Sequence, residues 1–327
     1  MTWRSILADL GLLVILGQGG HAGEPPASGN RDEAAAAVEA RVGELLEAAS
    51  SYLEEDAAKR EAAKTALVEI GAPAAPLLVA RLDSTNIMEQ IALFDVLPRI
   101  GEPAVDVLHA AFLGPGSPQI HRGAITLIGK IGSRRSAAIL TQAATDGDWA
   151  IRAAAADGLG RLAADLPEAR EHVYKLLGDE DWGVRLRAVW AIGDAGLGGE
   201  VKALAPLLED AHFGVRLAAA ELLAAQGTSG VAAIARRLEE HNPTRVGKLS
   251  CLEALGRTHH PGAAVHVEPF LIDADAVVRV YAARAYGDTA AQTGVVLCEA
   301  LLDEEMDRNV RLALQAALTA IKARIGN

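Results

Sequence analysis

Two kinds of amphipathic segment alternate along most of this chain, and in both of them the apolar positions have the spacing that is typical of an α-helix. The first kind opens with a capping residue, two variable positions and an apolar–basic pair, and continues as an Ala-rich run. It occurs nine times, at intervals of 30 to 33 residues. Clear copies are Asp148-Trp-Ala-Ile-Arg152, Asp181-Trp-Gly-Val-Arg185, Asp275-Ala-Val-Val-Arg279 and Asp307-Arg-Asn-Val-Arg311. A fixed period of this length predicts a solenoid of stacked helix pairs.

The capping position forms a row of its own through the repeats. Eight of its nine members have side chains preferred at helix N-caps, because their oxygens accept hydrogen bonds from the free N–H groups of a helix start. The exception is His212. The row therefore predicts where the first helix of each repeat begins. Its members are Asp56, Asn86, Ser117, Asp148, Asp181, His212, Thr244, Asp275 and Asp307.

A mostly basic row follows the capping row four residues later. Stacking of the repeats would bring each base near the capping carboxylate of its own or of the next repeat. We therefore expect Asp–Arg hydrogen bonds that join the repeats, and a basic strip that binds anions is the alternative. The row consists of Arg60, Gln90, His121, Arg152, Arg185, Arg216, Lys248, Arg279 and Arg311.

Glycine and leucine mark the ends of the two helices. We expect the first helix to end at a left-handed glycine, and Pro98 to kink or shorten the helix that contains it. Residues 31–53 are predicted to form an N-terminal capping helix. The glycines are Gly71, Gly101, Gly132, Gly196 and Gly227. The second helices close on Leu82, Leu113, Leu177, Leu208, Leu238, Leu271 and Leu302, with Ala144 in the remaining copy.

The repeat resembles the HEAT-like repeats of phycobilisome lyases and their relatives. The matching residues are those of Val215-Arg216-Leu-Ala-Ala-Ala-Glu-Leu-Leu and of Val278-Arg279-Val-Tyr-Ala-Ala-Arg-Ala-Tyr-Gly287. The resemblance implies an all-α fold, a right-handed α-solenoid of about nine HEAT-like hairpins over residues 54–327. It also implies that the helix after each capping residue lines the concave face and that the Leu-ended helix lines the convex face.

Composition narrows the choice of partners. The formal net charge is −12, and an acidic chain without a basic block gains little from phosphate groups, so neither nucleic acid nor an anionic membrane surface is an expected partner. Residues 1–22 are predicted to be a signal peptide cleaved near Ala22, and residues 23–30 a flexible linker. We therefore expect an exported protein, periplasmic or extracellular, whose mature chain has no segment inserted in the membrane.

The two cysteines are expected to be free and buried. Cys251 takes a position that is Ala188, Ala219 or Ala282 in other repeats, while Cys298 lies on the other type of helix. Two such positions rarely reach the Cα separation that a disulfide requires.

One stripe of the first helices has the residue types of an interface. Trp190 occupies a position that is Asp157, Glu221 or Glu253 in other repeats, so an exposed indole is expected there. Exposed Trp, Tyr and Arg carry much of the binding energy of interfaces, although an ordinary solvated stripe is the alternative. The predicted partner-binding residues, called the stripe below, are Asp157, Arg161, Arg187, Trp190, Asp194, Glu221, Glu253, Arg257, Tyr281, Arg284 and Asp288.

A second aromatic feature lies next to the capping row. Trp149, Trp182 and Phe213 directly follow the cap in three consecutive repeats. Such a row could bind a ligand, but a residue beside the cap usually packs on the neighbouring repeat. We expect the packing role.

Candidate chemistry is sparse. His259, His260, His266 and Glu268 are close in sequence, but Pro261 separates the first pair from the rest, so no metal site is expected. Gly158-Leu-Gly-Arg-Leu-Ala163 imitates a dinucleotide fingerprint at a helix end, without a preceding strand. We predict a non-enzymatic scaffold that binds another protein on its concave face and has no cofactor. A lyase-like or chaperone-like role, in which the protein handles a chromophore or cofactor for another protein, is the alternative.

Overall fold

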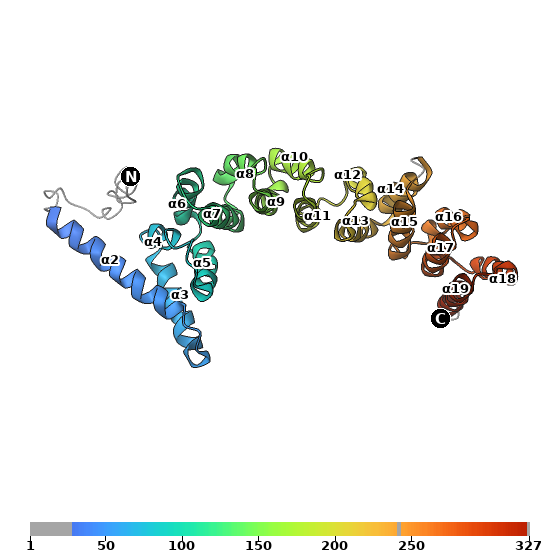
Figure 1. Cartoon of the computed structure of the whole chain (residues 1–327), viewed down its shortest axis with the longest axis horizontal. Helices are drawn as coiled ribbons and strands as arrows, with labels where there is room; N and C mark the ends of the chain where they lie inside the picture. The colour runs from blue at the N-terminus through green and yellow to red at the C-terminus, as the bar shows by residue number, and fades with distance from the viewer. Residues whose placement is uncertain (1–27, 241–242, 326–327) are drawn as a thin grey trace.

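A computed structural model describes residues 28–240 and 243–325 of the chain. Within these ranges the regular secondary structure is entirely helical. The predicted signal peptide and most of the predicted linker lie outside the described residues. The helices form an arched solenoid of two layers, and the ends of the described chain lie at opposite ends of the arch (Figure 1). The predicted all-α solenoid is confirmed.

The inner layer of the arch contains the helices that follow the capping row, as the resemblance implied (Figure 1). These helices are α3 (Ala57–Ile70), α5 (Ile87–Ile100), α7 (Pro118–Ile131), α9 (Trp149–Ala163), α11 (Trp182–Asp194), α13 (Phe213–Ala224), α15 (Arg245–Arg257), α17 (Ala276–Thr289) and α19 (Arg308–Ile325).

Most helices of the outer layer are shorter than those of the inner layer. The outer helices are α4 (Ala75–Val79), α6 (Glu102–Leu113), α8 (Ala137–Ala143), α10 (Pro167–Leu176), α12 (Val201–Leu204), α14 (Gly227–Glu240), α16 (Ala264–Val267) and α18 (Gly294–Glu304). Several of them are extended by 3₁₀ turns, namely η2 (Arg134–Ser136), η3 (Ala205–Glu209), η4 (Pro261–Ala263) and η5 (Glu268–Ile272), and η1 (Glu54–Asp56) precedes α3. Among the described residues, the nine predicted copies are therefore eight hairpins and a last copy that consists of α19.

Eight of the nine members of the capping row cap a helix, but His212 is among them and Asp56 is not. His212 caps α13, because its Nδ1 accepts a hydrogen bond from the backbone N–H of Gly214 at 3.2 Å. Asp56 precedes α3 without capping it, and its carboxylate accepts hydrogen bonds from Ser51 and Lys59 instead. The other seven members each accept a hydrogen bond from a backbone N–H two or three residues later.

The expectations for the helix ends need two corrections. All five predicted glycines have positive φ, and Gly132 lies in the left-handed helical region. Gly71 and Gly101 do not, since their ψ values are −128° and −135°. Pro98 does not shorten α5, which continues to Ile100. Pro98 lies in the last turn, where a missing N–H removes a single hydrogen bond of the helix.

The N-terminal helix α2 extends from Ser28 to Ala49, so it starts and ends earlier than the predicted span of residues 31–53. Its last turns pack on the solenoid through buried side chains, those of Val42, Leu45, Leu46 and Ala49. Residues 33–37 are exposed, and the first part of the helix projects beyond the first hairpin (Figure 1).

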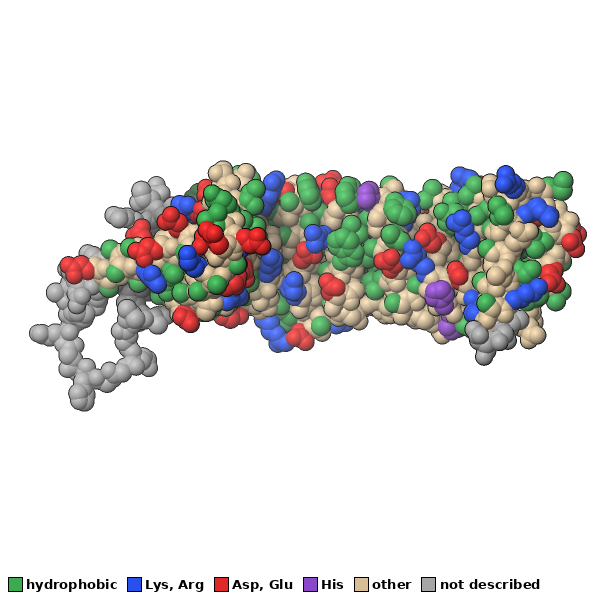
Figure 2. Space-filling model, turned by 90° about the horizontal axis from the view of Figure 1, so that it is seen from below, with side chains coloured by type: hydrophobic (Ala, Val, Ile, Leu, Met, Phe, Trp, Pro, Cys, Tyr) green, Lys and Arg blue, Asp and Glu red, His purple; other side chains and the backbone are tan. Residues whose placement is uncertain are grey.

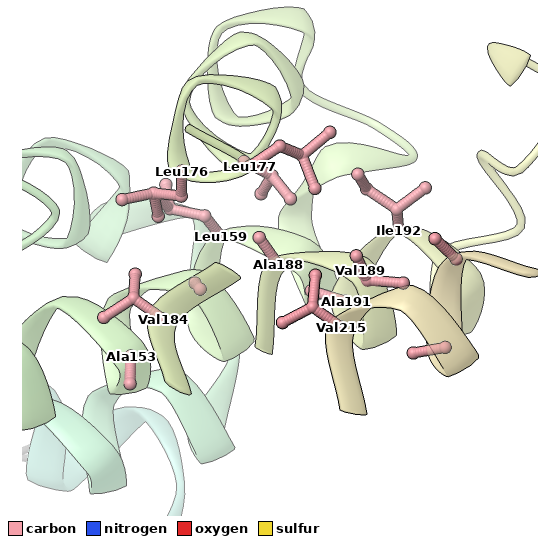
Figure 3. Packing of buried hydrophobic residues seen from close by; sticks show 14 of the residues in the cluster. Ala153, Leu159, Leu176, Leu177, Val184, Ala188, Val189, Ala191, Ile192 and Val215 are labelled. Atoms are coloured by element: carbon pink, nitrogen blue, oxygen red, sulfur yellow. The ribbon is translucent and has the colours of Figure 1, made fainter. Parts of the chain in front are cut away.

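One continuous cluster of buried apolar side chains extends from Val42 to Ile321. Figure 3 shows Leu176 and Leu177, at the end of α10, directed toward Leu159 of α9 and Ala188 of α11. Each hairpin thus buries its apolar side against its neighbours, and this mutual burial is the main stabilising force of a solenoid.

Glycine lets successive inner helices approach closely. A Cβ atom built on Gly158 would lie 2.8 Å from the Cα atom of Gly129 and 2.6 Å from a methyl carbon of Leu140. Both glycines lie inside helices, α9 and α7, that pack side by side. The imitation of a dinucleotide fingerprint at residues 158–163 is therefore a helix-packing feature.

Candidate interaction surface

The basic row joins neighbouring repeats through a partner that the sequence analysis did not identify. The guanidinium of Arg152 in α9 donates to both oxygens of Asp179 in the loop before α11, each at 2.8 Å. The same pairing recurs between Arg185 and Asp210 at 2.6 and 2.8 Å. Arg279 with Glu305 and Lys248 with Asp273 continue it. The predicted links between repeats exist, but each acceptor lies two residues before the capping residue.

The acceptor carboxylates, which lie two residues before the capping residues, each form two kinds of hydrogen bond. Asp179 also accepts a hydrogen bond from the backbone N–H of Asp181 at 2.9 Å, which orders the entry to α11. Although burial raises the pKa of Asp179, the hydrogen bonds from Arg152 and Asp181 outweigh it, so its pKa is lowered. The sequence signal for this row is an acidic residue two positions before the cap, as in Asp179-Glu-Asp181 and Asp273-Ala-Asp275.

The basic row is internally neutralised where it is most regular. The side chains of Arg152 and Asp179 are each only 9% exposed. The remaining guanidinium nitrogen of Arg152 donates to the backbone carbonyls of Asp146 and Gly147. A cation that is buried and paired in this way has little attraction left for a bound anion, so the geometry favours a structural role over an anion-binding strip.

The predicted stripe lies on the inner helices and forms separate local groups. The first joins α9 and α11, where Arg187 donates to Asp157 at 3.3 Å and its guanidinium lies 5.4 Å from the ring of Trp190. Trp190 is 48% exposed. Burial raises the pKa of Asp157, and nearby Asp194 acts in the same direction, while Arg187 and Arg161 oppose them.

The second and third groups lie further along the arch. Arg257 of α15 forms ion pairs with Glu253 at 3.0 Å and with Glu221 of α13 at 3.4 Å. On α17 the guanidinium of Arg284 lies 5.9 Å from the ring of Tyr281, as Arg187 lies near Trp190. The three remaining members of the stripe are exposed: Arg161, Asp194 and Asp288.

The histidines considered as metal ligands have separate partners. His260 caps η4 through its Nδ1, and His266 lies 3.2 Å from Glu239. Glu268 accepts a hydrogen bond from Tyr286 at 3.0 Å. Within the described ranges, no group of three or more His, Cys, Asp or Glu side chains is placed to hold a metal ion.

Both cysteines are buried, and neither takes part in a disulfide. Burial raises the pKa of Cys251 to about 12 and that of Cys298 to about 11. Both thiols are therefore protonated at neutral pH, and a thiol without thiolate character is a poor nucleophile. The sequence-based expectation is confirmed.

The two layers of stacked helices define a helical-repeat protein of the α-solenoid class. The profile of the family of HEAT repeats matches residues 105–193 and 171–256, which include the hairpins at the centre of the arch. The chain therefore contains HEAT repeats between residues 105 and 256. In the part of the chain that the structure describes, no helix is long and apolar enough to cross a membrane.

Solved structures of several different proteins have a similar arrangement of helices. The YibA protein of Escherichia coli is 16% identical, with 81% of this chain and 99% of that chain covered and a TM-score of 0.44. The CpcE–CpcF complex of phycocyanin lyase from Nostoc is 19% identical, with coverage of 76% and 94% and a TM-score of 0.36. Human deoxyhypusine hydroxylase is 18% identical, with coverage of 89% and 99% and a TM-score of 0.34. At these values the similarities carry no functional information. The comparison with curated proteins gave no match.

Proposed function

We propose that this protein is a non-enzymatic scaffold that binds another protein through the stripe on its inner face. The observation that carries the proposal is the half-exposed indole of Trp190, which lies beside Arg187 among the charged side chains of the stripe. A large apolar side chain in such a place gains most from being covered by a partner.

The recurrence of this pair supports the same function. Tyr281 and Arg284 repeat the aromatic–guanidinium pair three hairpins later, so two anchors lie on one face of a rigid array. Carboxylates and guanidinium groups surround both anchors, which favours a partner surface of mixed charge with an apolar centre. An interface of standard size would cover about 800 Å² of the stripe.

The test first captures the partner and then removes the anchors. A photo-cross-linking residue at Asp194, which is exposed beside Trp190, would capture proteins of the native host for identification by mass spectrometry. Replacing Trp190→Ala and Tyr281→Ala together is expected to weaken binding of the captured partner at least about tenfold, since buried anchors dominate interfaces.

A matched control comes from the outer layer. Val265 of α16 is 61% exposed, and Val265→Ala is expected to leave the affinity unchanged. Circular dichroism and a thermal melt would show that each variant is folded. A folded double variant that retains its affinity for the partner would refute the stripe as the binding surface.

A further inference from the structure

An exposed aromatic row lies apart from the stripe, at the first turns of α9, α11 and α13. It consists of Trp149, Trp182, His212 and Phe213, and its three largest apolar side chains are 54%, 47% and 60% exposed in the order Trp149, Trp182 and Phe213. Figure 2, which looks onto the inner face, shows hydrophobic side chains along one long edge of its middle part. None of these residues belongs to the stripe.

The two indole rings are supported by the next repeat without being covered by it. The ring of Trp182 stacks on His212 with 3.8 Å between ring centroids and an interplanar angle of 14°. Trp149 lies against Gly183, where a Cβ atom would be 3.6 Å from the indole. The packing role expected from the sequence therefore uses only part of each ring, and about half of the apolar surface remains open to solvent.

Carboxylates flank the row. Asp146 and Asp148 precede Trp149, and Glu180 and Asp181 precede Trp182. Asp148 is paired with Arg122, whereas the side chain of Glu180 is 89% exposed, although it lies 3.5 Å from Arg152. At the other end of the row, the guanidinium of Arg216 lies 5.6 Å from the ring of Phe213. Carboxylates and the faces of indole rings both attract cations. A second copy of this chain, with its net charge of −12, would be repelled, so charge complementarity favours a basic partner.

The period of the row favours an extended partner. Packed helices lie 8–10 Å apart, so consecutive rings are about 10 Å apart along the arch. A polyproline II segment rises about 3.1 Å per residue with three residues per turn, which brings every third residue to the same side after about 9 Å. Such segments characteristically dock on aromatic side chains.

We propose that this aromatic row binds an extended, basic, proline-rich segment of a partner, with a residue that contacts a ring at every third position. Proline and guanidinium planes of the segment would lie on the open parts of the rings, and its charges would lie near Glu180 and Asp181. The row is a binding surface in addition to the stripe.

A synthetic peptide tests the proposal on the full chain. The probe is a fluorescein-labelled peptide of five Pro-Pro-Arg units, and binding is followed by fluorescence anisotropy. We expect saturable binding that weakens as salt is added, because part of the attraction is between charges. A peptide of five Pro-Pro-Glu units is expected not to bind. An Ala-Arg peptide that forms a helix and has the same charge is expected to bind at least about tenfold more weakly, because its contacts do not match the period.

Substitutions in and outside the aromatic row test whether the peptide binds there. Trp182→Leu, which keeps an apolar side chain, is expected to weaken binding of the Pro-Pro-Arg peptide about tenfold, because stacking and cation–π contacts are lost. Glu180→Gln is expected to weaken binding of this peptide about threefold and to reduce the salt dependence of binding. Trp190→Leu, on the stripe, is the matched control and should leave peptide binding unchanged.

These outcomes separate the two proposals. No binding of the Pro-Pro-Arg peptide, equal binding of the helical basic peptide, or an unchanged affinity in folded Trp182→Leu would each overturn the aromatic row as such a site. If Trp182→Leu does not fold, Glu180→Gln decides, because its exposed side chain contributes little to folding. None of these results bears on the stripe, which depends on Trp190 and Tyr281.

Discussion

The first hairpins of the arch and the later ones are joined in different ways. In four of the later inner helices, α9, α11, α15 and α17, the basic row reaches the acidic residue of the next repeat, as in the pair of Arg152 with Asp179. Arg216 of α13 is an exception, since it donates to carbonyls of its own loop. In the earlier hairpins the equivalent residues bind only their own loop. Gln90 donates to the carbonyls of Leu82 and Ser84, and His121 lies 3.1 Å from the carbonyl of Gly114.

The packing does not follow the same division. The early inner helices α5 and α7 bury large side chains such as Leu93 and Ile128, and α9 buries Leu159 in the same way. The close approach at Gly158 of α9 is to Gly129 of α7, so it joins the two regions. The lesson is that one period can be maintained with or without paired charges between the repeats.

The largest expected effect comes from removing a buried charge of the regular part. Arg152→Ala would leave Asp179 without its guanidinium partner, which should lower the free energy of unfolding by about 3 kcal/mol. Urea denaturation, with hydrogen exchange to locate the weakened hairpins, measures it. Gln90→Ala is the matched change in the early hairpins and should cost about 1 kcal/mol, because it removes neutral hydrogen bonds. Equal losses in both variants would mean that the two regions are joined alike.

A smaller effect is expected where the helices approach most closely. A methyl group at Gly158 would be too near Leu140 and Gly129, so Gly158→Ala should destabilise the protein by about 1–3 kcal/mol. Gly43 of α2 has no atom within 4 Å of a built Cβ, and Gly43→Ala should stabilise the helix by about 0.5–1 kcal/mol. Thermal melts of the two variants compare the sites. A neutral Gly158→Ala would show that the inner helices can separate without cost.

Acid should weaken the ion pairs that join the later repeats. The pKa values of Asp179, Asp210, Asp273 and Glu305 are lowered, because hydrogen bonds from their basic partners and the backbone outweigh burial. Their contribution is complete above the unfolded pKa of about 4 and is lost as the pH falls through the lower folded values. The urea midpoint should therefore drop between pH 5 and pH 3.

The control for this pH dependence is Asp179→Asn, which removes one of the titrating carboxylates. Its midpoint is expected to be lower than that of the parent at pH 7 but to change less with pH. A variant with the full pH dependence of the parent would show that the acid sensitivity has another origin.

Much of the architecture could be predicted because it depends on local chemistry. Capping is decided within three residues of a helix start, which is why eight of the nine predicted residues cap their helices. The failure at Asp56 is also local, since Ser51 and Lys59 occupy its carboxylate. The stripe was predicted from the same periodicity, and its members do lie on the inner helices, but its role in binding stays a prediction.

The amino-acid order alone determined the period, the helix starts, the two layers and the burial of Cys251 and Cys298, because each of these follows from spacing along a single helix or between copies. Only the tertiary structure decided which acid each base meets. Arg152 is closer in sequence to Asp148 than to Asp179, but the neighbouring hairpin brings Asp179 into contact, while Asp148 caps α9 and pairs with Arg122 of α7. The same stacking covered one part of each ring of the aromatic row and left the rest exposed, since exposure depends on what the next repeat presents.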